Sequence, residues 1–126
     1  MKYLGVDFGL RKIGLAYSEG ELAAPIKTVE VSNFLDAVEK VYEFFKKEEF
    51  TKIVVGLPEG KMGKNVLGFV KKLKKRGLEV ETFDETLSSK RAKQVMIELG
   101  VPLKKRRYED AYSAAEILQD YLDAKK

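Results

Sequence analysis

"YLGVDFGLRKIGLAY", residues 3–17, holds one carboxylate, Asp7, in a run that otherwise resembles the inside of a sheet. Two strand-like runs, 2–8 and 11–18, are separated by Gly9-Leu10, which predicts an antiparallel hairpin. An ionised carboxylate taken out of water without a partner costs several kcal/mol. Another part of the chain must therefore offset the cost of burying Asp7.

The rest of the chain alternates strand and helix patterns. Apolar residues at helical spacing separate the helices from short β-branched runs, which are typical of buried strands. In chain order the patterns predict strands over 25–31, 51–58 and 78–85, which alternate with helices over 33–49, about 66–76 and 86–99. Asn33 caps the first of these helices, and Gly77 stops the second. A last helix follows the basic stretch 104–110, and its apolar stripe consists of Ala111, Ala115, Leu118 and Leu122. This order predicts an α/β fold with a five-stranded mixed sheet, its first three strands antiparallel, and helices on both faces.

Composition limits the possible chemistry. The 126 residues, 44% of them apolar, predict one domain over 1–126, and no apolar run approaches the roughly 20 residues that a bilayer requires. The N-terminus begins on a strand-like run, so the expected location is cytoplasmic. The chain has no Cys and no His, which excludes the usual zinc sites and histidine-based catalysis. Carboxylates that hold Mg²⁺ or Mn²⁺ are the natural alternative, and the net charge of +4 suggests a polyanionic partner.

Acidic residues from distant parts of the chain are expected at one edge of the sheet. Asp7 ends the first strand, Asp84 and Glu85 end the fifth, and Asp110 lies in the first turn of the last helix. The carboxyl ends of parallel strands share an edge, where ligands gather. A divalent cation shared by Asp7, Glu85 and Asp110 would neutralise the buried charge, since crowded carboxylates repel one another without one.

Each of these acids also has a purely structural interpretation. Asp7 also fits a strand end that bonds the amides of the Gly9 turn. Asp84, Glu85 and Asp110 stand where acids cap helices or favour the helix dipole. The basic residues 104–107 fit a solvated loop equally well, so the metal hypothesis rests on the acids taken together.

Two further motifs are weak. "DFG" at 7–9 matches the kinase metal-binding triplet, but no glycine loop or catalytic loop accompanies it. "GLPEGKMGKN" at 56–65 lacks the spacing of a phosphate-binding loop. It is interpreted as a flexible loop at the active edge, with Lys61 and Lys64 placed to touch a phosphate backbone.

Four stretches together carry a family resemblance. "VDFGLRKIGLAYS", "IVVGLP", "DETLSSKRA" and "DAYSAAEILQDYL" occur in the order found in the YqgF family, also called RuvX-like. Members of that family are assigned to nucleolytic processing of the 5′ end of pre-16S rRNA, or to Holliday junction resolution. The resemblance covers essentially the whole chain and implies a ribonuclease H-like fold, in agreement with the element order above.

The resemblance also implies roles for individual residues. Asp7 matches the first metal ligand, with Gly9 and Gly14 completing its signature. Glu85 matches the second acid with Asp84 in a supporting role, and Asp110 matches the acid that opens the last helix. The expected nucleic-acid contacts are Arg91, Lys61, Lys64, Lys104, Lys105, Arg106 and Arg107, with Tyr108 as a candidate for base stacking. Two departures are Ser113-Ala114, where relatives carry two alanines, and a loop after Pro58 that is shorter than usual, which weakens the assignment of the two loop lysines.

The implied reaction is phosphodiester hydrolysis with two Mg²⁺ or Mn²⁺ ions about 4 Å apart, which needs no protein base. Pre-rRNA is the expected partner, and branched DNA is the alternative. A junction resolvase would act as a homodimer, since it cuts two opposed strands. A nucleic-acid-binding assembly factor without catalysis is a further alternative, and the sequence leaves monomer and homodimer open.

Overall fold

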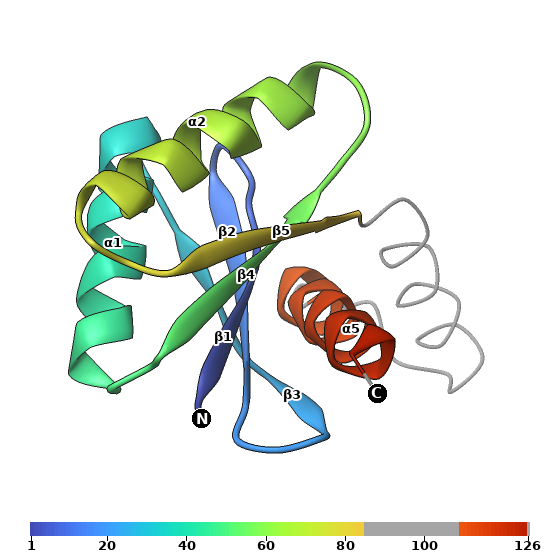
Figure 1. Cartoon of the computed structure of the whole chain (residues 1–126). Coiled ribbons are helices and arrows are strands. Elements are labelled where there is room, and N and C mark those ends of the chain that lie inside the picture. The colour runs from blue at the N-terminus through green and yellow to red at the C-terminus, as the bar shows by residue number, and fades with distance from the viewer. Residues whose placement is uncertain (85–108, 126) are drawn as a thin grey trace.

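A computed structural model describes residues 1–84 and 109–125 (Figure 1). The sheet has five strands in the order β3-β2-β1-β4-β5. Neighbours β1, β2 and β3 pair antiparallel, whereas β1–β4 and β4–β5 pair parallel. The strand bounds are Tyr3–Asp7 for β1, Lys12–Ser18 for β2, Ala23–Glu30 for β3, Lys52–Leu57 for β4 and Val80–Asp84 for β5. The predicted five-stranded mixed sheet is therefore confirmed.

Helices cover both faces of this sheet (Figure 1). Helices α1 (Phe34–Lys47) and α2 (Lys61–Lys75) lie on one face, and α5 (Glu109–Ala124) lies on the other. Successive side chains of β1 point to opposite faces of the sheet. Leu4 and Val6 join the core under α1 and α2, and Tyr3 packs with the cluster under α5. No helix among the described residues is long and apolar enough to cross a membrane.

Helix α1 begins where the sequence predicts. The Asn33 side chain accepts a hydrogen bond from the Asp36 amide at 2.8 Å, and Asp36 in turn accepts one from the Ser32 amide. Val38, Val41 and Phe45 of this helix are buried. Phe34, the first residue of the helix, packs only at the margin of this core.

Helix α2 begins at Lys61, about five residues earlier than predicted. Gly60 has a φ of +80°, which lets the chain turn directly into the helix, and the Gly63 amide donates to the Gly60 carbonyl at 3.1 Å. A Cβ on Gly63 would stand 3.0 Å from the Pro58 carbonyl oxygen, so a glycine suits this close turn. The interpretation of 56–65 as one flexible loop was wrong, and Lys61 and Lys64 lie in the first turns of a helix.

The buried face of α5 is broader than the predicted stripe. Ala111 and Leu118 are buried as predicted, but Ala115 and Leu122 are only half-buried. The residues that complete the buried face are Ser113, Ala114, Ile117 and Tyr121. The reason is that α5 crosses β1, β2, β3 and β4 instead of resting on one strand, so a wider sector of the helix loses contact with water.

A cross-strand ion pair stabilises the amino-terminal ends of β4 and β5. Lys52 Nζ lies 2.8 Å from Glu81 Oε1, and the Lys52 side chain is only 11% exposed. The hydrogen bond with Lys52 is the main cause that lowers the pKa of Glu81, and the same bond raises the pKa of Lys52. Replacement of Glu81 would leave the Lys52 ammonium without its carboxylate partner.

Glu81→Gln is expected to lower the free energy of unfolding at pH 7 by about 1 kcal/mol, a value discounted because the Glu81 side chain is 45% exposed. A lowered carboxyl pKa contributes stability above the unfolded-state pKa, about 4.3 for Glu, which is lost as the pH falls through the folded-state value. The gap between wild type and variant should therefore be full at pH 7 and close in acid. Urea unfolding at pH 7 and pH 3 measures it, with the exposed neighbour Glu79→Gln as control. A gap that persists undiminished at pH 3 would contradict this account.

Candidate metal and nucleic-acid site

Asp7 and the first turn of α5 meet across one glycine. Asp7 ends β1 half-buried, and its antiparallel partner on β2 is Gly14. A Cβ built on Gly14 would lie 1.8 Å from the backbone carbonyl oxygen of Asp110, so the start of α5 rests directly on this glycine. Directly opposite residues on antiparallel strands share a face of the sheet and stand about 5 Å apart. Asp7 and Asp110 are therefore brought to the same face and the same edge.

A second glycine stands on the other side of Asp7. The register pairs Val6 with Val55, which puts Asp7 level with Gly56, and Gly56 pairs with Phe83 on β5. The row across the sheet is therefore glycine, Asp7, glycine, Phe83. Gly56 places no side chain between Asp7 and β5, two strand spacings or about 10 Å away.

Asp84 lies at the predicted edge of the sheet but on the opposite face from Asp7. Phe83 packs with Tyr121 of α5, their ring centroids 6.1 Å apart. Since successive residues of a strand point to opposite faces, Asp84 belongs to the face that carries α2, not to the face of Asp7. The next residue, Glu85, lies outside the described residues. Between the two neighbouring acids, strand alternation thus disfavours Asp84 as a partner of Asp7.

Gly9 holds the turn that follows Asp7. A Cβ at Gly9 would stand 2.4 Å from the carbonyl oxygen of Lys12, so any larger residue would push the two strands apart. Gly9 and Gly14 thus support the site in different ways. Gly9 closes the β1–β2 connection, and Gly14 admits α5 to the sheet.

Two acids of the predicted metal site are therefore placed, and the third is not. Asp7 and Asp110 supply carboxylate oxygens, the ligands that Mg²⁺ and Mn²⁺ prefer. Within residues 1–84 and 109–125, no three acidic side chains gather closely enough to hold a metal ion. The remaining predicted residues lie outside the described ranges and stay predictions: Glu85, Arg91, Lys104, Lys105, Arg106, Arg107, Tyr108 and the helix over 86–99.

Helix α2 brings basic side chains to the same edge. It follows the carboxyl end of β4, and both Lys61 and Lys64 are exposed in its first turns. Four lysines farther along this helix were not predicted as contacts: Lys71, Lys72, Lys74 and Lys75. Their signal was present in the sequence as a long segment with many cations and no acid.

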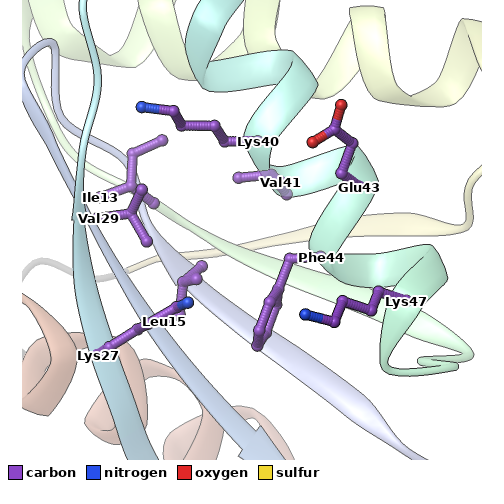
Figure 2. Close-up of a pocket in the computed structure, with 9 residues that line it drawn as sticks. All are labelled: Ile13, Leu15, Lys27, Val29, Lys40, Val41, Glu43, Phe44 and Lys47. Atoms are coloured by element: carbon purple, nitrogen blue, oxygen red, sulfur yellow. The ribbon is translucent and has the colours of Figure 1, made fainter.

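A pocket of about 260 Å³ lies elsewhere, between α1 and the strands β2 and β3 (Figure 2). Its walls are largely apolar, with Ile13, Leu15 and Val41 buried at the base. Lys27 lies over the Phe44 ring, 5.0 Å from its centroid. This pocket is on the α1 side of the sheet, whereas Asp7 faces α5, so the two do not form one site.

Comparison with known proteins gives a consistent result along the whole chain. Residues 1–124 match the RuvX family, described as Holliday junction resolvase. A protein of Natranaerobius thermophilus named "Putative pre-16S rRNA nuclease" is 35% identical, and the match covers 98% of this chain and 94% of that protein. A protein of the same name from Caldanaerobacter subterraneus subsp. tengcongensis is also 35% identical, with coverage of 100% and 99%.

Solved structures share the fold at lower identity. RuvC of T. thermophilus in complex with a Holliday junction substrate matches with a TM-score of 0.65 and 17% identity, covering 99% of this chain and 95% of RuvC. The fowlpox virus Holliday junction resolvase matches with a TM-score of 0.69 and 10% identity, covering 100% of both chains. Identities this low establish a common ribonuclease H-like architecture and no more.

Proposed function

Because this chain belongs to the RuvX family, we propose that it is a metal-dependent nuclease that processes the 5′ end of pre-16S rRNA. The relatives at 35% identity are named "Putative pre-16S rRNA nuclease" and match along nearly their whole length. One structural observation carries the proposal: the Gly14 contact brings Asp110 to the same face of the sheet as Asp7. Carboxylates at one edge of the sheet offer the oxygen ligands that a divalent cation prefers.

The proposed ligands are Asp7, Asp110 and Glu85. Bound Mg²⁺ or Mn²⁺ ions supply an activated water and stabilise the leaving oxygen of the phosphodiester. The backbone of Asp7 is fixed in the β1–β2 ladder, and the backbone of Asp110 is fixed by the contact of α5 with Gly14, which supports their proposed joint role. The predicted basic residues Arg91 and 104–107 are proposed to hold the substrate through its phosphates.

A second candidate is a Holliday junction resolvase. The RuvX family is described by that activity, and the RuvC structure that shares this fold contains a junction substrate. Symmetric cleavage of a junction requires two active sites, and this candidate therefore also predicts a homodimer.

A cleavage assay separates these functions. Wild-type protein is incubated with a 5′-leader pre-16S rRNA fragment and, separately, with a four-way DNA junction, each with Mg²⁺, with Mn²⁺ or with chelator. We expect RNA cleavage that requires the metal and leaves the junction intact. Cleavage of the junction alone would favour the resolvase, and binding of both without cleavage of either would favour a non-catalytic assembly factor.

A further inference from the structure

The positive charge of this protein is concentrated in two segments, 61–76 and 90–107, each of which holds seven Lys and Arg. The chain holds 24 Lys and Arg against 20 Asp and Glu. Residues 61–76 contain seven of these cations and no acid, which leaves 17 cations against 20 acids in the rest of the chain. Without helix α2 and its C-cap Arg76, the protein would be acidic. A field of one sign on one surface attracts polyanions.

Four lysines of α2 form a straight row. Lys61, Lys64, Lys71 and Lys75 are separated by three, seven and four residues, the spacing that keeps side chains on one face of a helix. All four are exposed, whereas Val66, Phe69 and Leu73 point to the core. We call this row the α2 lysine stripe. At 1.5 Å per residue it extends about 21 Å.

The stripe has no acidic partner among the described residues. The ion pairs recorded in residues 1–84 and 109–125 involve Lys40, Lys52 and Arg76, and none involves a lysine of the stripe. Arg76 differs from the stripe because it binds Glu39 and stacks on Tyr42, 4.0 Å from the ring centroid, so it fastens α2 to α1. No carboxylate within residues 1–84 and 109–125 neutralises the four lysines.

The stripe begins at the edge that carries the candidate site. The chain leaves β4 at its carboxyl end and enters α2 at Lys61, and the helix then runs back across the α1 side of the sheet (Figure 1). A polyanion whose reacting phosphate lies near Asp7 would thus meet Lys61 first and Lys75 last. The direction of α2 leads away from the site and offers contacts to flanking substrate.

We propose that the α2 lysine stripe binds the phosphate backbone of a double-helical segment of the substrate next to the cleavage site. This inference rests on the proposed nuclease function. Leu67 is the only large apolar side chain exposed on α2, and the helix presents no exposed aromatic ring among its residues. Single strands are bound largely by stacking of bases on aromatic rings, whereas the bases of a duplex are already stacked inside it and its outer surface is lined by phosphates. A rigid, straight row of ammonium groups without aromatic rings therefore fits a duplex.

The test measures duplex affinity as a function of salt. Binding of a fluorescent RNA duplex, and of one of its single strands, is followed by anisotropy in chelator from 50 to 300 mM KCl. Lys71→Gln/Lys75→Gln removes two predicted phosphate contacts, both distant from Asp7. We expect the slope of log K against log salt for the duplex to fall in magnitude by about 1.8, with at least a tenfold loss of affinity at low salt.

A matched variant controls for the loss of two charges. Lys27→Gln/Lys47→Gln removes two exposed lysines from the mouth of the α1 pocket, where they lie beside Phe44 (Figure 2). We expect its duplex slope to equal that of wild type. Equal slopes for all three proteins, or equal losses in both variants, would overturn the proposal. A larger loss for the single strand than for the duplex would also overturn it.

The outcome is separable from that of the proposed function. Binding is measured without metal, so a protein that cuts nothing can still show the loss of slope in the α2 variant. In that case the duplex surface stands and the nuclease proposal falls. Conversely, metal-dependent cleavage by wild type together with an unchanged slope in the α2 variant would leave the nuclease proposal standing and remove the duplex surface.

Discussion

Asp7→Asn is expected to reduce metal-dependent cleavage by about a thousandfold or more, which corresponds to about 4 kcal/mol of lost transition-state stabilisation. Asparagine preserves the size of the side chain and one oxygen but removes the negative charge that a divalent cation requires. The half-buried position of Asp7, with Asp110 brought to the same face, makes water a poor substitute for the lost carboxylate. Single-turnover cleavage at saturating protein, with Mg²⁺ and with Mn²⁺, measures the effect.

The same variant should fold as well as wild type. Asparagine keeps the size of the side chain and one of its oxygens, so the melting temperature in chelator is expected to stay close to that of wild type. Asp123→Asn, at the far end of α5, is the matched control and should retain wild-type cleavage. If Asp7→Asn cleaves at the wild-type rate, Asp7 is no metal ligand and its role is confined to the turn that follows it.

Gly14→Ala is expected to lower the free energy of unfolding by about 3 kcal/mol and the melting temperature by about 10 °C. Its new methyl group would lie 1.8 Å from the Asp110 carbonyl oxygen and 2.1 Å from the carbonyl carbon. Backbone atoms cannot rotate out of the way as a flexible side chain can, so the first turn of α5 must move. Thermal unfolding followed by circular dichroism measures the loss.

The displacement of α5 should also affect cleavage. Asp110 moves with the first turn, so the activity of Gly14→Ala should fall well below that of wild type even at temperatures where the variant is fully folded. Gly20→Ala is the control, because a Cβ at Gly20 meets nothing within 4 Å. Gly14→Ala with wild-type stability and cleavage would show that α5 does not depend on this contact for its position.

The strands and α1 could be predicted from sequence because each has a local cause. A continuous buried run rich in β-branched residues defines β4, and Asn33 with Asp36 defines the start of α1. The start of α2 could not be predicted in this way. Gly60 and Gly63 are helix breakers by propensity, and only the close approach to Pro58 shows why glycine is used in that turn. Which residues of α5 are buried depends on the strands that the helix crosses, and the sequence of the helix itself does not determine those strands.

In the candidate site, too, some features could be predicted from the sequence and others depend on tertiary structure. Asp7 was identifiable because a carboxylate in an apolar strand is costly and demands an explanation. Its relation to Asp110 required the β1–β2 register and the absence of a side chain at Gly14, both of which are tertiary facts. The family resemblance ranked Glu85 ahead of Asp84, and the opposite alternation of Asp84, which follows from the packing of Phe83 on α5, agrees with that order.

The packing of α5 against the backbone of two glycines affects how the protein tolerates changes in the length of the β5–α5 connection. At Gly5 a Cβ would meet the Ala114 carbonyl oxygen and Leu118 Cβ at 2.9 Å, and at Gly14 it would meet Asp110. Because neither glycine has a side chain, α5 packs directly on the sheet backbone at two points, and these two contacts fix its position. The spacing between Asp7 and Asp110 is thereby decoupled from the number of residues that join β5 to α5. Insertions or deletions in that connection, outside the predicted site residues Glu85, Arg91 and 104–107, would leave Asp7 and Asp110 at the same edge of the sheet.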